Sequence, residues 1–115
     1  MGPGIEWIGE DGLWVEVSWI NTNAADWKVD SGYAFKYATV TLVDGRLSSR
    51  PGQPTIGAHR LHGSEQGTGS FGGYASASGT LPHWWPTGLQ LPTGGCWVVT
   101  EKSGGTAVSF QVQLP

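Results

Sequence analysis

The pattern that most restricts how this chain can fold lies near its C-terminus, where two segments rich in β-branched and aromatic residues flank a short turn. The segments are 94–100 and 107–114, and residues 103–106 between them contain two glycines. In the second segment every other residue is apolar: Val108, Phe110, Val112 and Leu114. A period of two is typical of a strand that packs on one face only. We therefore expect an antiparallel hairpin.

The composition agrees with a fold that is rich in strands and turns. The 115-residue chain contains 19 glycines, and only 13% of its residues are charged. Many glycines between short apolar runs suit an all-β protein rather than a helical one. The length gives room for one domain. We expect a single immunoglobulin-like antiparallel β-sandwich over residues 1–115, with six to eight strands and no substantial helix.

Several other segments also have strand character. In 13–20 the odd positions are the expected core face: Leu13, Val15, Val17 and Trp19. The longest β-prone run, 33–43, is expected to form one strand or two, followed by a turn at Asp44-Gly45. Residues 55–61 predict a further strand, and 89–91 a short one.

The remaining segments are expected to lack regular structure. Residues 21–32 are polar and predict a loop, with Trp27 exposed in it. Residues 62–79 form the longest stretch of low hydrophobicity, which is typical of a mobile, disordered or functional loop. The prolines at 82 and 86 predict that the segment between them is neither helix nor central strand.

Four short segments resemble a known group of domains: Asp11-Gly12-Leu13-Trp14-Val15, Gly57-Ala58-His59-Arg60-Leu61, Thr87-Gly88-Leu89-Gln90-Leu91-Pro92-Thr93 and Gly94-Gly95-Cys96-Trp97-Val98-Val99-Thr100. The group is an uncharacterised family of bacterial secreted and lipoprotein immunoglobulin-like domains with a Pro-Thr-x-Gly-Cys-Trp segment. The resemblance covers about half of the chain, and residues 21–36 have no counterpart in it. It implies an extracytoplasmic sandwich and implies no activity.

The charge and the cysteine count narrow the range of partners. The net charge is −3 and the six basic residues are dispersed, so nucleic-acid binding is not expected. A single cysteine, Cys96, excludes an internal disulfide and a Cys-x-x-Cys site. No apolar stretch approaches 18 residues, and no signal peptide is visible. We expect an extracytoplasmic protein, with membrane anchoring only through a removed or lipidated leader, and no cofactor.

Nucleophilic catalysis would use Cys96 with a histidine as base. The cysteine opens an apolar strand, and we expect it to be a small buried side chain rather than a thiolate nucleophile. A metal site would join His59 and His62 to His83 or Cys96. Surface histidines beside an arginine are the simpler interpretation, and convergence of the four residues stays open.

For two further functions, calcium binding and glycoside hydrolysis, the chain contains the required residue types but not the required spacing. A calcium loop would draw on oxygen ligands in the first polar segment: Asn21, Asn23, Asp26 and Asp30. Glycoside hydrolysis needs two carboxylates that face each other, and Glu16 and Glu101 both fall on predicted polar faces. We expect a protein that is not an enzyme.

The surplus of tryptophan gives the best functional lead. Seven tryptophans exceed what one small sandwich core usually holds, and indoles outside a core stack on sugar rings or anchor protein interfaces. The candidate ligand-binding residues are Trp27, Tyr74, His83, Trp84 and Trp85. We expect a binding or accessory module that mediates protein–protein contact or assembly. The alternative is a carbohydrate-binding module with a tryptophan stacking platform, and a metal-binding protein or small hydrolase is the third hypothesis.

Overall fold

The fold was determined as a computed structural model, which describes residues 6–21, 24–76 and 83–115. Two short 3-10 helices occur, η1 (Ser18–Asn21) and η2 (Ala24–Trp27). The strands in chain order are β1 (Trp7–Glu10), β2 (Leu13–Glu16), β3 (Lys28–Val29), β4 (Gly32–Val43), β5 (Arg46–Leu47), β6 (Thr55–Arg60), β7 (Gln66–Phe71), β8 (Ala75–Ser76), β9 (His83–Leu91), β10 (Gly95–Ser103) and β11 (Thr106–Leu114). No helix among the described residues has the length and apolar character needed to cross a membrane.

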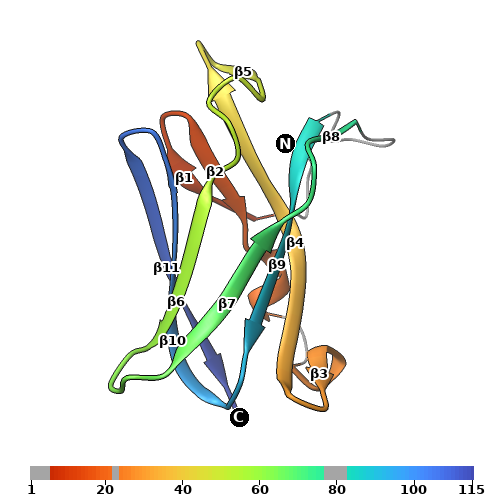
Figure 1. The fold of residues 1–115 in the computed structure, drawn as a ribbon, viewed down its shortest axis with the longest axis vertical. Helices are drawn as coiled ribbons and strands as arrows, with labels where there is room; N and C mark the ends of the chain where they lie inside the picture. The colour runs from red at the N-terminus through yellow and green to blue at the C-terminus, as the bar shows by residue number, and fades with distance from the viewer. Residues whose placement is uncertain (1–5, 22–23, 77–82) are drawn as a thin grey trace.

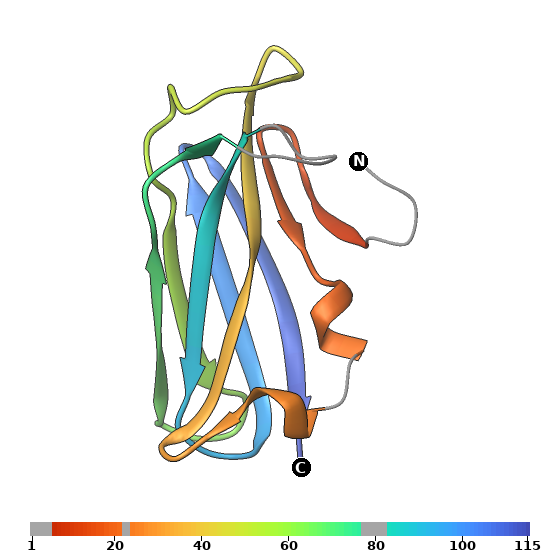
Figure 2. The ribbon, with the colours of Figure 1, turned by 90° about the vertical axis from the view of Figure 1, so that its right-hand side faces the viewer.

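The strands form one antiparallel sheet that curls until its two ends almost meet (Figures 1 and 2). Its main path is β1-β2-β4-β9-β7-β6-β10-β11, and the short strands β3, β5 and β8 pair at its margins. The last strand, β11, comes to lie beside β1 and β2. The result is a barrel-like all-β fold of the sandwich-like class, which confirms the expected fold class.

The inward-facing residues of the curled sheet form the core. The C-terminal hairpin has the expected alternation, and Trp97 and Val99 of β10 lie opposite Val112 and Phe110 of β11. The strand predicted over 33–43 is one strand, β4. The core side chains are Leu13, Val15, Val17, Trp19, Tyr33, Phe35, Tyr37, Ala58, Leu89, Leu91, Trp97, Val99, Val108, Phe110, Val112 and Leu114.

The strand expected over 13–20 ends early. β2 stops at Glu16, and η1 follows it. The indole N–H of Trp19 donates to the Glu16 carbonyl at 2.7 Å, and the indole stacks on Tyr37 with ring centroids 4.9 Å apart. Local hydrogen bonds thus replace the sheet ladder while Trp19 stays buried, so the core face was predicted correctly and the secondary structure was not.

Two elements were not expected near the N-terminus and in the polar segment. β1 precedes the Asp11-Gly12 turn and pairs with β2 as a hairpin. Gly9 is needed there, because a Cβ would lie 2.7 Å from the Cα of Trp14 on the paired strand. The predicted loop 21–32 contains η2 and β3, and Trp27 is half-buried against Phe35 at a centroid distance of 5.5 Å. Its expected exposure was therefore wrong.

The prediction of a loop over 62–79 was also wrong for much of its length, because β7 is an interior strand of the sheet. It pairs with β6 on one side and β9 on the other. The register places Gly67 and Gly69 on the inward face, opposite Ala58 and Leu89. Because the inward positions are glycines, the strand lacks the apolar alternation by which buried strands are recognised.

The central strand β9 contains Pro86, although prolines were expected to exclude such a strand. The Pro86 carbonyl accepts a hydrogen bond from Gly72 N at 2.8 Å, so the backbone polar groups of this residue face the β7 side. The last residue pair between β7 and β9 is Phe71 with Thr87, so Pro86 lies one residue beyond the end of this pairing. The missing proline N–H therefore falls where the neighbouring strand has ended, which is one of the few places in a sheet that tolerate proline.

The close packing of β7 yields a prediction. Alanine at Gly69 would place its Cβ 2.3 Å from Ile56 Cγ2. We expect Gly69→Ala to lower the unfolding free energy by about 1–3 kcal/mol, as overpacking commonly does. Urea denaturation would measure the loss.

The matched control is Gly57→Ala, where a Cβ would meet nothing within 4 Å. It should change stability by less than about 0.5 kcal/mol, or raise it slightly. Adding Ile56→Ala to Gly69→Ala should recover part of the loss. Equal stability of the Gly69 and Gly57 variants would contradict the assigned packing.

Candidate functional site

Three of the five predicted ligand-binding residues meet at one end of the curled sheet. Tyr74 stacks on His83 at a centroid distance of 5.8 Å and contacts Trp85 at 4.8 Å. Trp85 is buried, and its indole N–H donates to Thr41 Oγ1 at 3.0 Å. The Tyr74 hydroxyl is buried without a hydrogen-bond partner among the described residues, and this burial raises the Tyr74 pKa. Trp85 therefore supports the cluster from inside.

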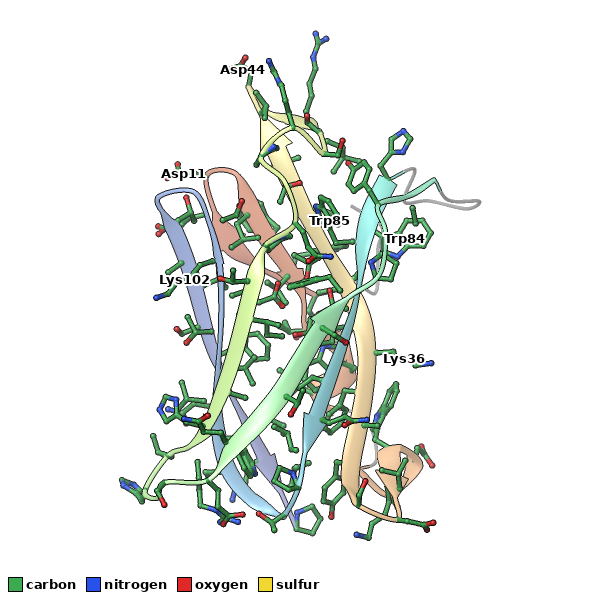
Figure 3. The ribbon with its side chains drawn as sticks, in the orientation of Figure 1. Asp11, Lys36, Asp44, Trp84, Trp85 and Lys102 are labelled. Atoms are coloured by element: carbon green, nitrogen blue, oxygen red, sulfur yellow. The ribbon has the colours of Figure 1, made fainter. Side chains whose placement is uncertain are left out.

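Trp84 lies on the opposite face of β9. Because successive strand residues alternate faces, Trp84 points outward while Trp85 points into the barrel (Figure 3). The fifth residue, Trp27, packs near the far end of β4 against Phe35. The five residues are thus brought to three separate places and do not form one continuous platform.

A shallow groove of about 580 Å³ borders Trp84 on the outer face of β4, β9 and β7. Gly88 lies in the middle of it, paired with Lys36 on β4 and with Ser70 on β7. Gly88 provides no side chain, so the exposed Lys36 and Ser70 flank a low floor. Pro86 continues this floor toward Trp84, which is half-buried.

The residues proposed for metal binding or nucleophilic catalysis are brought together only in part. Cys96 lies on the strand paired with β6, and its carbonyl accepts a hydrogen bond from the N–H of Leu61, between His59 and His62, at 2.9 Å. His83 lies apart from them, beside Tyr74. His59 is exposed on β6, His62 is exposed in the turn that follows, and Cys96 is free and half-buried on β10. We expected Cys96 to be a small buried side chain, but it is only half-buried. Among residues 6–21, 24–76 and 83–115 no group of three or more His, Cys, Asp or Glu side chains could hold a metal ion.

The candidate calcium loop is described only in part. Asn23 and the side chain of Asn21 lie outside the described residues, and Asp26 and Asp30 are exposed.

The interior contains a polar cluster that the sequence did not predict. Glu101 was expected on a polar face, but its side chain is completely buried among β4, β9 and β10. Its carboxylate accepts hydrogen bonds from the Tyr37 hydroxyl and from Thr39 Oγ1, both at 2.8 Å. Thr39 is in turn 2.8 Å from Thr87 Oγ1. The sequence did contain one signal of this burial: Glu101 follows Trp97 and Val99 at intervals of two, which places the three side chains on the same face of the strand.

The electrostatics of this cluster are set by burial. Burial raises the pKa of Glu101 from its ordinary value of 4.5 to about 7, and the hydrogen bonds from Thr39 and Tyr37 only partly oppose the shift. Burial also raises the Tyr37 pKa, helped by the nearby charges of Glu101 and Glu16. Glu16 itself accepts hydrogen bonds from the backbone N–H and hydroxyl of Ser18, so the two carboxylates are engaged in different contacts.

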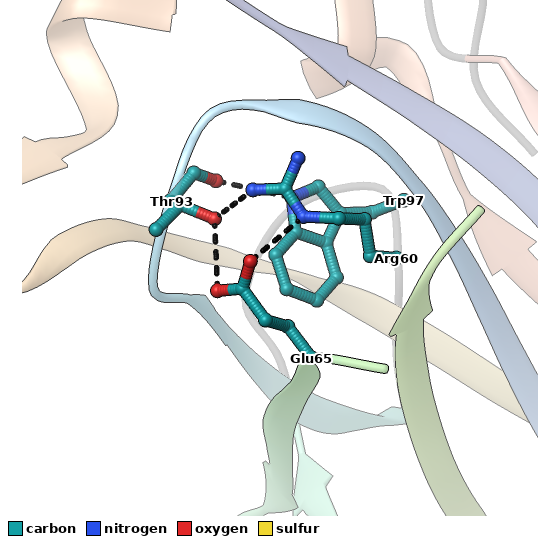
Figure 4. A network of polar contacts seen from close by, with 4 residues as sticks. All are labelled: Arg60, Glu65, Thr93 and Trp97. Atoms are coloured by element: carbon teal, nitrogen blue, oxygen red, sulfur yellow. Dashed lines mark hydrogen bonds and ion pairs between the residues drawn. The ribbon is translucent and has the colours of Figure 1, made fainter. Parts of the chain in front are cut away.

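A polar cluster of Arg60, Glu65, Thr93 and Trp97 lies at the other end of the sheet (Figure 4). The Arg60 guanidinium forms an ion pair with Glu65 at 3.0 Å, donates to Thr93 Oγ1, and lies 5.4 Å from the Trp97 ring centroid. The Trp97 indole N–H donates to the Thr93 carbonyl at 3.0 Å. A Cβ at Gly95 would lie 2.5 Å from Arg60 Nη1. These residues therefore join the β6–β7 and β9–β10 turns.

The buried carboxyl yields a second prediction. The folded-state pKa of Glu101 lies above 4.5, so the unfolded chain releases this proton first as the pH rises. The contribution of this raised pKa to the unfolding free energy is complete below pH 4.5. It is lost between pH 4.5 and about 7 and is absent above that. From about pH 5 to about pH 8, the wild type should lose about 2–3 kcal/mol more unfolding free energy than Glu101→Gln.

Urea denaturation of both proteins across this pH range measures the difference. Glutamine keeps the shape and can accept from Tyr37 while donating to Thr39, so it removes the titration rather than the network. Parallel pH profiles for the two proteins would contradict the assignment.

No protein-family model, curated protein or solved structure matches this chain.

Proposed function

We propose that this chain is a non-enzymatic, extracytoplasmic binding module and that its ligand is a polysaccharide. The observation that carries the proposal is the groove on the outer face of β9, where Trp84 stands beside a floor formed by Pro86 and Gly88. Apolar ring faces of sugars stack on indoles, and hydroxyl groups bond to polar side chains at the rim. Lys36 and Ser70 supply such a rim.

The position of the groove supports this use. β9 is paired with β4 along most of its length and with β7 beyond Pro86, so the groove residues are held by two neighbouring strands. Residues on paired strands keep their spacing better than residues on loops, which reduces the entropy lost on binding. A strand rise of about 3.3 Å per residue places Trp84 about 13 Å along β9 from the Lys36–Gly88 pair. This length accommodates more than one sugar ring.

The exposed surface gives less support to an apolar protein-docking patch. Within the described residues, Val29 is the one large hydrophobic side chain that is substantially exposed, at 41%. Four tryptophans outside the core are half-buried: Trp7, Trp14, Trp27 and Trp84. Surfaces that form large protein interfaces usually expose a broader apolar patch in the unbound protein.

Protein–protein contact is the second candidate, and a different feature favours it. Among the described residues the terminal strand β11 pairs only with β10, and the nine residues of β11 include no charge and no proline. Edge strands of natural proteins usually carry charged residues or proline, because these residues prevent pairing with strands of other chains. If β11 pairs with another strand, Gln111→Lys should weaken concentration-dependent association, measured by analytical ultracentrifugation, while the wild type associates. A wild type that stays monomeric in this measurement would contradict self-association through this edge.

The polysaccharide proposal predicts the effect of removing the indole. We expect Trp84→Ala to weaken binding to any polysaccharide that the wild type binds by about twofold to tenfold, since ring stacking contributes about 0.5–1.5 kcal/mol. A panel of neutral and acidic polysaccharides, titrated by isothermal calorimetry and by tryptophan fluorescence, would measure the loss.

The matched control is Trp14→Ala, which removes a half-buried indole on β2 that does not border the groove. It should leave the affinity unchanged. Absence of binding across the panel would refute the polysaccharide proposal. Zinc or copper bound to the purified protein in elemental analysis would instead support the metal-binding hypothesis.

A further inference from the structure

The charge of the groove narrows the class of sugar. We propose that the Trp84 groove recognises an acidic saccharide, with Lys36 contacting a sugar carboxylate while Trp84 stacks on a neighbouring ring. This inference rests on the proposed polysaccharide-binding function. Trp84 and Lys36 project from the same side of the sheet, away from the barrel interior (Figure 3).

Lys36 is available to an external anion. It is exposed, and it is the one charged residue among the described residues that line the groove. Within the described part of the chain the single ion pair joins Arg60 to Glu65, so Lys36 has no carboxylate partner there. The chain as a whole carries a net charge of −3, so the positive charge of Lys36 in the groove is opposite in sign to the net charge of the protein. This contrast favours an anionic over a neutral ligand.

The neighbouring side chains leave space for a sugar between the two contacts. Gly88 lies beside Lys36 in the register, and Pro86 lies between Gly88 and Trp84. A Cβ at Gly88 would make its nearest contact with Ser70 Oγ at 3.4 Å, so the position is open rather than filled. Ser70 places a hydroxyl on the far side of Gly88 from Lys36, where it can bond to a sugar hydroxyl.

A second groove, on the outer face of β6 and β10, provides the comparison. It holds about 510 Å³, its lining includes Lys102 and His59, and none of its lining residues is a tryptophan, tyrosine or phenylalanine. Lys102 is exposed, as Lys36 is. The second groove therefore offers a lysine but lacks an indole, and Lys102→Gln is the matched control.

The experiment compares short oligogalacturonides with their methyl-esterified forms. Both have the same sugar rings, and only the former carry carboxylates. Calorimetric titration of the wild type should show tighter binding of the acidic form by about threefold to fivefold, as one exposed ion pair provides. Lys36→Gln should abolish this preference without weakening binding of the esterified form, whereas Lys102→Gln should preserve it. Added salt should reduce the preference.

A blocking variant provides a second test that removes no functional group. Gly88→Val places a side chain on the floor of the groove in a residue type that strands favour, and should weaken both ligands while the unfolding curve stays near that of the wild type. Equal affinity of the wild type for the two ligands, or an equal loss in the Lys36 and Lys102 variants, would overturn the acidic preference. In that case Trp84-dependent binding of neutral polysaccharides would leave the proposed function standing. Failure of every polysaccharide would remove both.

Discussion

The hydrogen bonds that Glu101 accepts from Tyr37 and Thr39 connect opposite sides of the curled sheet through its interior. Glu101 belongs to β10, whereas Tyr37 and Thr39 belong to β4, which lies several strands away along the sheet path. Apolar contacts fill the same interior but have little directional preference. A fully satisfied polar cluster selects one register, because slipping either strand would leave a buried carboxyl without donors. The cluster thus fixes how the two halves of the sheet face each other.

The parts of the fold that could be predicted are those where apolar and polar residues alternate. The C-terminal hairpin, the inward face of β4 and the positions of Leu13 and Val15 follow from that pattern alone. β7 could not be found in this way, because glycines replace apolar residues on its inward face. β9 was obscured by Pro86, whose position is acceptable only because β7 ends beside it. In both strands, residues that usually argue against a buried strand are tolerated because of what the neighbouring strands place beside them.

The candidate site could be predicted only in outline. The surplus of tryptophan directed attention to Trp84 and Trp85, but the sequence could not tell that one points outward and the other inward. Lys36 and Gly88 were not among the predicted site residues, because their importance arises from cross-strand pairing between segments far apart in the chain. Glu101 was misplaced for a related reason, since its burial depends on hydroxyl donors supplied by β4.

Strand β9 assigns its two sets of alternating residues to different tasks. Trp85, Thr87, Leu89 and Leu91 complete the interior, while the residues between them face outward. Substitutions at the outward positions therefore change the surface without opening a cavity inside. A chain built in this way can acquire new recognition properties by mutation while its folding stability is conserved. The same separation makes β9 a practical position for directed evolution of binding specificity.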